Sequence, residues 1–412
     1  GAMDLYCALS GIEQALWDVV ERHRDDPVYG SIVLVRDASL SQVAAVAARK
    51  LELPGVVIEQ VATRYYPAEQ LAAHLFGYVG EITDAQLTSG EFEGVTIGTI
   101  VGQSGIEQAY NDLLMGQDGE RRVVVNTIGR EIKSVGERQA LEGRRLQLTL
   151  DYDLQQAAEN AFAVAGYAGA AVVLDPRTGE VLALASVPAY DPNAFALGID
   201  ADTWGALNTN PLKPLPNRAL QGRYSPGSVF KIAIVLAALE EGVATPDFEV
   251  ECQGGASFYD EYFSCHATHG TVDMYQAIEK SCNTYFYTLG SLLSIEAIHK
   301  WATAIGLGEL SGIDLPHEVQ GIMPSTEWKR TTTGEPWYPG ETISVSIGQG
   351  PVTVTPVSLA VAIATVANGG RRLAPFLLKA IDTGDGWIPA PPPPPKFVVS
   401  LKPETIETLQ RG

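Results

Sequence analysis

A hairpin of two apolar segments constrains the fold of this chain more than any other part of its sequence. Residues 169–174 (GAAVVL) and 181–186 (VLALAS) are apolar segments of strand length. They are joined by residues 175–179 (DPRTG), which place proline and glycine where tight turns use them. The pattern predicts an antiparallel pair of strands, and such a sheet must bury a face against another element.

Helical patterns dominate the chain after this hairpin. Apolar residues recur with helical spacing in several segments, which glycine, proline and polar residues separate. The expected helices cover Val229–Glu241, Met274–Lys280, Thr284–Leu293, Ile295–Ile305 and Pro356–Ala367. A hairpin followed by many helices predicts an α+β domain, in which an antiparallel sheet carries a helical cluster on one side.

The chain before Gly143 mixes both patterns. We expect helices over Ile12–Val20, Ser41–Leu51, Ala68–Phe76 and Gly105–Leu114, and strands over Ser31–Val35, Arg121–Asn126 and Glu131–Val135. Because a domain takes about 150 residues as a soft rule, a chain of this length should hold two or three domains. We predict a mixed α+β domain over residues 1–143 and a second domain over residues 144–412.

The charge balance excludes one class of partner. Of 412 residues, 28 are Lys or Arg and 49 are Asp or Glu, which gives a net charge of −21. A chain this acidic is repelled by phosphate backbones, so we expect no nucleic-acid partner. No apolar run approaches the ~18 residues that a membrane-spanning helix needs. The opening Gly1-Ala2-Met3 indicates a cloning remnant, so a native anchor or signal would have preceded it.

The strongest chemical motif is Ser228-x-x-Lys231. It follows Pro226-Gly227 and opens the expected helix, so Ser228 should lie at a helix N-terminus. Residues i and i+3 share a helix face, which brings the Lys231 amine within reach of the Ser228 hydroxyl. A serine becomes a nucleophile when a neighbouring base takes its proton, and a buried lysine can be that base. Taken alone, the motif is equally a serine helix cap followed by an ordinary lysine.

A second motif, Ser281-x-Asn283, lies between two expected helices. A hydroxyl and an amide two residues apart can face one cleft, where Ser281 would relay a proton and Asn283 would hold a substrate amide. Serine and asparagine also cap helices, so this motif is weak by itself.

The two motifs together resemble the penicillin-recognising serine acyltransferases. Further segments are similar to class B penicillin-binding proteins over about residues 60–370, and the wording of the motifs is closest to penicillin-binding protein 2 of cell elongation. The similar segments are the hairpin turn at 175–183, Asn217-Arg218-Ala219, Ser346–Gly350, Arg64–Pro67, Gly77–Gly80 and Gly102–Glu107.

This resemblance implies a transpeptidase domain behind a non-catalytic pedestal. It implies a D,D-transpeptidase that cross-links peptidoglycan stem peptides through an acyl-enzyme on Ser228 and is inhibited covalently by β-lactams. Lys231 would be the base, Ser281 would move the proton and Asn283 would position substrate, with no cofactor and no metal. It further implies the extracytoplasmic face of a bacterial membrane, an N-terminal anchor outside this sequence, and a membrane glycan polymerase and the elongation machinery as partners.

Two departures keep other functions open. The third family motif, Lys-Thr-Gly or Lys-Ser-Gly, does not occur in the 412 residues, nor does the Arg-Gly-x-Ile segment that usually follows the anchor. In the family the third motif holds the substrate carboxylate. A β-lactam sensor or non-catalytic scaffold is therefore one alternative. A serine β-lactamase or D,D-carboxypeptidase is another, although the long front domain is unusual for a compact lactamase.

The cysteines leave one question open. The chain has four of them, Cys7, Cys252, Cys265 and Cys282, too few for a disulfide scaffold. Cys252 and Cys265 would pair in an oxidising compartment, but reduced and partly buried thiols are as good an interpretation. Together with His266 and His269 they match no strong zinc spacing. We therefore expect a surface segment without a metal.

Overall fold

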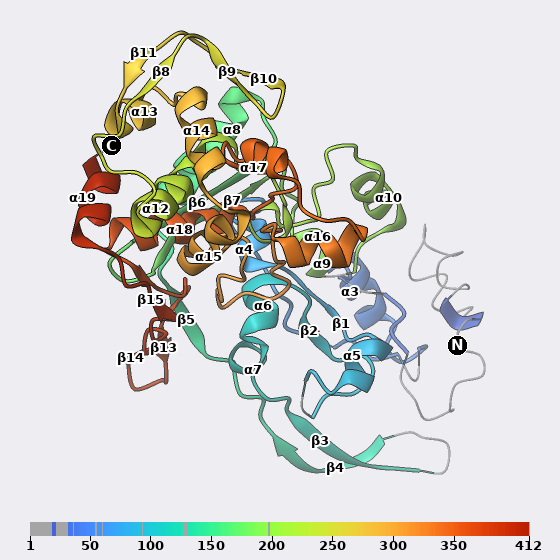
Figure 1. Cartoon of the computed structure of the whole chain (residues 1–412). Helices are drawn as coiled ribbons and strands as arrows, with labels where there is room; N and C mark the ends of the chain where they lie inside the picture. The colour runs from blue at the N-terminus through green and yellow to red at the C-terminus, as the bar shows by residue number, and fades with distance from the viewer. Residues whose placement is uncertain are drawn as a thin grey trace.

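The computed structural model describes residues 19–21, 32–35, 37–53, 56–59, 61–92, 94–126, 131–196 and 198–411 (Figure 1). The expected hairpin is present as β6 (Gly169–Leu174) and β7 (Val181–Val187), which pair antiparallel. Strand β7 is buried along almost its whole length, so both of its faces are covered. Helix α8 (Tyr152–Ala165) packs on β7, and α18 (Pro356–Ala367) packs on β6. The predicted α+β class is thereby confirmed.

Helix α12 (Lys231–Glu241) is the centre of the helical half. Its residues from Ala233 to Ala238 are 0% exposed. A helix that is apolar on all sides must be surrounded by other elements. Around it lie α13 (Met274–Glu279), α14 (Asn283–Leu292), α15 (Ile295–Ile305) and α19 (Pro403–Arg411).

Short helices and strands complete this half of the chain. Two small antiparallel sheets, β8 with β11 and β9 with β10, cover the end of the helical cluster drawn in yellow in Figure 1. The remaining elements are α9 (Asn193–Ala196), α10 (Ala201–Thr209), α11 (Arg218–Gln221), η1 (Gly227–Phe230), β8 (Val250–Cys252), β9 (Gly255–Phe258), β10 (Glu261–Ser264), β11 (Gly270–Val272), α16 (Thr326–Thr333), α17 (Pro339–Val345), β12 (Arg371–Arg372), β13 (Leu378–Asp382), β14 (Trp387–Pro389) and β15 (Phe397–Val398).

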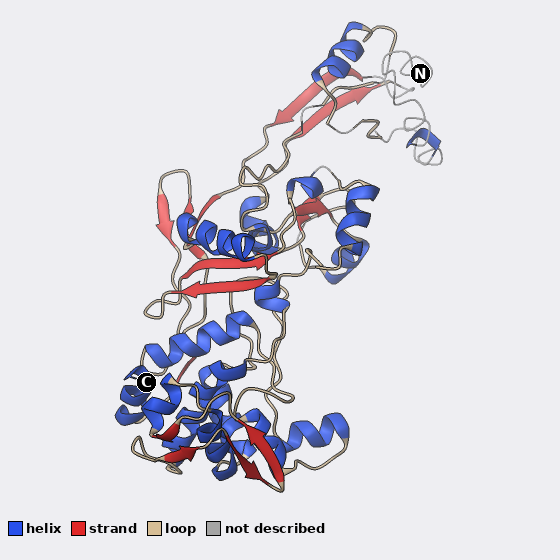
Figure 2. Cartoon of the chain, turned by 90° about the horizontal axis from the view of Figure 1, so that it is seen from above, coloured by secondary structure: helices blue, strands red, loops and turns tan. Residues whose placement is uncertain are grey.

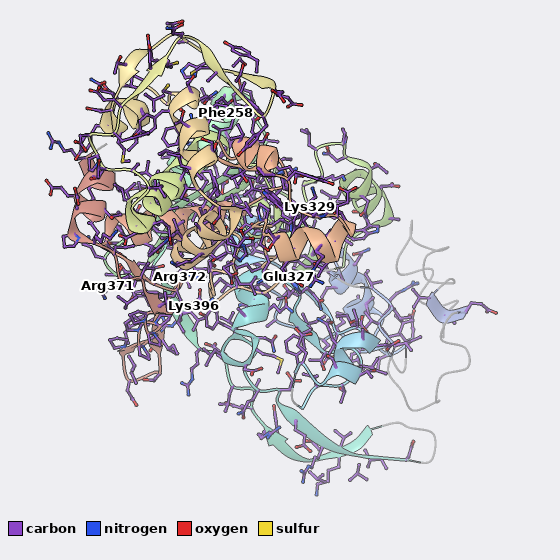
Figure 3. All side chains as sticks on the ribbon, in the orientation of Figure 1. Phe258, Glu327, Lys329, Arg371, Arg372 and Lys396 are labelled. Atoms are coloured by element: carbon purple, nitrogen blue, oxygen red, sulfur yellow. The ribbon has the colours of Figure 1, made fainter. Side chains whose placement is uncertain are left out.

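The C-terminal segment is held against the end of α15. Arg372 donates to the carbonyl oxygens of Thr303 and Leu310 at 3.2 and 3.3 Å, and Lys396 donates to Leu310 at 2.8 Å. Arg372 and Lys396 lie close together on this side of the molecule (Figure 3). Cations at the carboxyl end of a helix complement its unpaired carbonyl groups and its dipole.

The N-terminal half consists of small units, and its β3–β4 hairpin projects away from the rest in both views (Figures 1 and 2). Within the part of the chain that the structure describes, no helix combines the length and apolarity that crossing a bilayer requires. The elements are α3 (Leu40–Ala48), α4 (Ala73–Phe76), β1 (Val79–Glu81), α5 (Asp84–Ser89), β2 (Ile100–Gly102), α6 (Gly105–Ala109), α7 (Asn111–Leu114), β3 (Glu120–Val125), β4 (Glu131–Arg138) and β5 (Arg145–Leu148).

Several predicted elements differ in this half. The helix expected over Gly105–Leu114 is two short helices that meet at Tyr110, and the one expected over Ala68–Phe76 is helical only in α4. Residues 32–35 are described but form no strand, against the prediction. Most of the helix expected over Ile12–Val20 lies outside the described residues. Tertiary contacts override local propensity here, because the Tyr110 hydroxyl is drawn to the Asp314 carboxylate of the other half.

Asp314 and β5 join the two halves. The Asp314 carboxylate accepts the hydroxyl of Tyr110 and also the backbone N–H groups of Leu377 and Leu378 at 2.9 and 3.1 Å. Strand β5 pairs antiparallel with β13, which comes more than two hundred residues later. The beginning and the end of the catalytic-type half are therefore fixed to each other and to the N-terminal half.

Gln155 offers a test of this packing. It is 0% exposed, and its amide accepts the N–H of Leu184 at 2.8 Å and donates to the Leu184 carbonyl at 3.1 Å. Gln155→Ala leaves both backbone groups of β7 without these partners, so we expect a loss of about 2–4 kcal/mol in the free energy of unfolding, measured by urea denaturation. The exposed neighbour Gln156→Ala should change it by less than about 0.5 kcal/mol. Equal effects of both substitutions would contradict this account.

Candidate active site

Ser228 lies in a single 3-10 turn that leads into α12. Gly227 has φ of +56°, a conformation that glycine adopts without strain, and its N–H donates to the carbonyl of Gly348 at 3.0 Å. Phe230 is 0% exposed and anchors the turn in the core, while Ser228 itself is exposed. The predicted position of Ser228 at the start of this helix is confirmed, and its hydroxyl is open to a substrate.

The Lys231 side chain is buried and bound by three oxygen atoms. Its Nζ donates to Ser281 O at 2.8 Å, to Ser281 Oγ at 2.9 Å and to Asn283 Oδ1 at 2.7 Å. The residue is 3% exposed, so these oxygens replace water around the ammonium group. The two sequence motifs, fifty residues apart, are therefore joined at one amine.

Ser281 connects this amine to the exposed hydroxyl. The Ser281 Oγ donates to Ser228 Oγ at 3.0 Å while it accepts from Lys231. The i to i+3 spacing correctly predicts that Lys231 and Ser228 are close, but the hydrogen bonds between them pass through Ser281. The structure thus brings together all four residues that the sequence singled out, Ser228, Lys231, Ser281 and Asn283.

Burial lowers the pKa of Lys231 to about 8. The nearby thiol groups of Cys265 and Cys282 oppose this shift, and the Phe286 ring lies 5.0 Å from Nζ. A lysine with a pKa near 8 is partly neutral at physiological pH. In its neutral form the amine accepts a proton, and the two hydrogen bonds can then run from Ser228 through Ser281 to Lys231.

The backbone of Ser281 is strained. Its φ is +51°, in the left-handed region that costs a residue with a Cβ about 1–2 kcal/mol. The turn is held because Ser281 N donates to Ile278 O and Cys282 N donates to Ala277 O, both at 3.0 Å. This turn ends α13, and Asn283 begins α14 directly after it. Such strain is common where a side chain must point into a functional site.

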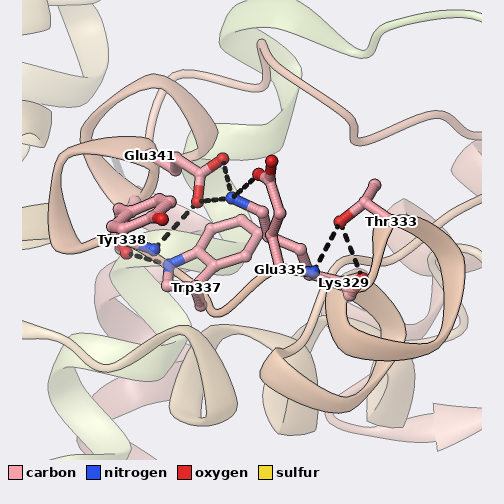
Figure 4. A network of polar contacts seen from close by, with 7 residues as sticks. Lys329, Thr333, Glu335, Trp337, Tyr338 and Glu341 are labelled. Carbon is pink, nitrogen blue, oxygen red and sulfur yellow. Dashed lines mark hydrogen bonds and ion pairs between the residues drawn. The ribbon is translucent and has the colours of Figure 1, made fainter.

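The loop at Gly348 supports the nucleophile turn from the other side. Gly348 has φ of +71°, and a Cβ at this position would lie 2.1 Å from the Gly227 carbonyl oxygen. Only glycine allows this approach. The loop follows α17, which is tied to α16 by the buried Lys329. Its Nζ pairs with the Glu341 carboxylate at 2.6 Å and lies 4.5 Å from the Tyr338 ring (Figure 4).

The cysteines give a result that the sequence analysis did not anticipate. We expected a surface segment, but Cys252 and Cys282 are both 0% exposed. Together with Cys265 and His269, they place four candidate ligand atoms within 4.8 Å of one another. The three described cysteines are free thiols. The signal was present in the sequence, but Cys282 had been counted with Ser281 and Asn283 and not with the cysteines upstream.

Two family models match the chain. Residues 169–412 match the Penicillin binding protein transpeptidase domain, and residues 12–148 match the Penicillin-binding Protein dimerisation domain. Together the two matches take in most of the chain.

Two curated relatives bear the name peptidoglycan D,D-transpeptidase MrdA. The protein from Acinetobacter baumannii is 40% identical over 337 residues, which are 80% of this chain and 50% of the relative. The protein from Escherichia coli (strain K12) is 36% identical over 380 residues, which are 89% of this chain and 59% of the relative. The chain thus spans about half of the length of these relatives.

Solved structures resemble the whole of the described fold. Pseudomonas aeruginosa PBP2 in complex with WCK 5153 has a TM-score of 0.74 at 34% identity, covering 92% of this chain and 75% of the other. The complex between PBP2 and MreC from Helicobacter pylori has a TM-score of 0.81 at 29% identity, covering 99% and 73%.

A pair of substitutions at Ser281 tests the strain in the turn. Ser281→Gly and Ser281→Ala remove the same hydroxyl, so both lose the same hydrogen bonds with Lys231 and Ser228. They differ in the cost of the left-handed backbone, and we expect the glycine variant to be more stable by about 1 kcal/mol in urea unfolding. An alanine variant as stable as the glycine variant would show that the turn is relaxed.

Proposed function

The chain belongs to the penicillin-binding protein transpeptidase family, and from this membership we propose that its protein is a peptidoglycan D,D-transpeptidase of the penicillin-binding protein 2 type. The division near Gly143 would separate its pedestal from its transpeptidase domain. The observation that carries the proposal is the continuous path from buried Lys231 through Ser281 to the exposed hydroxyl of Ser228. A base, a relay and a nucleophile in hydrogen-bond contact are what acyl transfer requires.

In the proposed reaction, Ser228 Oγ attacks the carbonyl carbon of the penultimate D-alanine of a stem peptide. Its proton passes through Ser281 Oγ to the neutral Lys231 amine. The peptide C–N bond breaks, the departing D-alanine nitrogen takes a proton from Lys231 through the same relay, and an ester to Ser228 remains. An amine of a second stem peptide then attacks this ester and restores the Ser228 hydroxyl, which forms the cross-link.

The other residues position the reactants. Asn283 Oδ1 holds the ammonium form of Lys231 at 2.7 Å, and its amide nitrogen would donate to a substrate carbonyl. The N–H groups at the start of α12 lie beside Ser228, where negative charge develops on the carbonyl oxygen. β-Lactams would acylate Ser228 in the same way, because ring opening leaves the same ester on serine.

The protein would work outside the cytoplasmic membrane with the elongation machinery. This rests on relatives, since one solved neighbour is a complex of PBP2 with MreC and another is a peptidoglycan synthase complex that coordinates polymerization and crosslinking. Stem peptides, a membrane glycan polymerase and an MreC-type protein are therefore the proposed partners.

Covalent labelling tests the nucleophile. The full-length protein incubated with a penicillin should gain the mass of one adduct, and Ser228→Ala should lose more than ~99% of that labelling while its unfolding midpoint stays unchanged. Ser225→Ala, in the same exposed loop, should be labelled normally. An adduct on Ser228→Ala would sink the assignment. An adduct that hydrolyses within seconds would favour a β-lactamase, and a stable adduct without cross-linking activity would favour a sensor.

The pH dependence of acylation tests Lys231. With a pKa of about 8, the neutral fraction of Lys231 falls about fifty-fold between pH 8 and pH 6. The second-order rate constant of acylation should fall by the same factor on acidification and level off above pH 8. Lys231→Arg should be slow at every pH, since a guanidinium does not release its proton in this range. A wild-type rate that is flat from pH 6 to pH 9 would exclude Lys231 as the base.

A further inference from the structure

We propose that Cys252, Cys265, His269 and Cys282 bind one zinc ion, and that this ion fixes the turn that carries Ser281 and Asn283. The metal site is independent of the proposed function. Its effect on acylation rests on the proposed function, because it acts through Ser281 and Asn283.

The geometry already approaches that of a zinc site. His269 Nδ1 lies 3.5 Å from Cys252 Sγ and 3.6 Å from Cys265 Sγ, and all four ligand atoms are within 4.8 Å of one another. In a tetrahedral site with Zn–S bonds of about 2.3 Å and a Zn–N bond of about 2.0 Å, ligand atoms are about 3.5–3.8 Å apart. A small contraction of the cluster would therefore place an ion at its centre.

The donor chemistry selects the metal. Three thiolates and one imidazole form a Cys3His set, which is a closed structural zinc set and leaves no position for a catalytic water. Soft sulfur donors disfavour magnesium and calcium, which take oxygen ligands. Cys252 and Cys282 are fully buried, as expected for a site that is structural and not catalytic.

The surrounding fold needs such a link. Cys252 ends β8, Cys265 follows β10, and His269 precedes β11, so three ligands come from two small two-stranded sheets. Strands of three or four residues in isolated pairs are not stable on their own. Their own apolar contacts are few, with Phe258 (Figure 3) and Phe263 packing on Tyr287 of α14. An ion that joins both sheets to α14 would supply the missing stability.

The same ligands contact the catalytic turn directly. Cys282 stands between Ser281 and Asn283 in the chain. Cys265 Sγ accepts the backbone N–H of Asn283 at 3.2 Å, and Cys252 Sγ lies 3.2 Å from Thr284 Oγ1. Hydrogen bonds from N–H and O–H groups to metal-bound sulfur are the usual outer contacts of such sites. The ion would thus hold the turn in the strained shape that points Ser281 at Lys231 and Ser228.

Metal analysis is the first test. The full-length protein, purified under reducing conditions without added metal, should contain about one zinc per chain by mass spectrometry of the elements. His269→Ala should lose at least about four fifths of it, whereas His266→Ala, which changes the exposed histidine nearby, should keep it. A metal-free protein, or a zinc content unchanged in His269→Ala, would overturn the site. So would a disulfide between Cys252 and Cys265 in the reduced preparation.

Chelation of the wild-type protein covers the case in which a variant fails to fold. Removal of zinc by a strong chelator should expose three reactive thiols, lower the unfolding midpoint and slow penicillin acylation at least about tenfold, and added zinc should reverse all three changes. Normal acylation of the zinc-free protein would overturn the positioning role. Absence of acylation in the untreated protein would instead count against the proposed function and leave the zinc measurements standing.

Discussion

The burial of one ammonium group governs the site. Lys231 is almost completely withdrawn from water, and a buried charge costs several kcal/mol unless other polar atoms surround it. Ser281 and Asn283 provide those atoms from the start of α14. If α12 and α14 moved apart, the charge would be left without partners. The need to satisfy this single group therefore keeps two distant motifs aligned, and it also lowers the pKa of Lys231 into a useful range.

Rigid neighbours make this arrangement possible. Tyr285 and Phe286 are 0% exposed and anchor α14 in the core, directly after the strained turn. On the other side, the ion pair of Lys329 with Glu341 fixes α17, whose following loop meets Gly227 at Gly348. An unfavourable backbone conformation persists only where the surroundings hold it in place. The nucleophile turn and the relay turn are each held from both ends.

Local patterns in the sequence predicted the elements, but not all the contacts among them. The β6–β7 hairpin and α12 follow from strand and helix periodicity, and the four site residues follow from motif spacing. The route through Ser281 depends on tertiary packing, which the i to i+3 rule does not describe. The cysteine cluster was missed because its members come from separate elements, and no local rule joins Cys252 to Cys282. Tyr110 interrupts a helical pattern for a contact with Asp314 that is equally distant in the sequence.

The pairing of β5 with β13 has a consequence for how the chain acquires its structure. A strand near residue 145 waits for a partner near residue 380, so this sheet cannot close until nearly the whole described chain has been delivered. Contacts of such long range slow folding, because a large loop must be closed before the contact forms. Until then the edge of β5 is open to pairing with other chains. During synthesis and export, the emerging polypeptide therefore depends on cellular factors that keep this edge from aggregating.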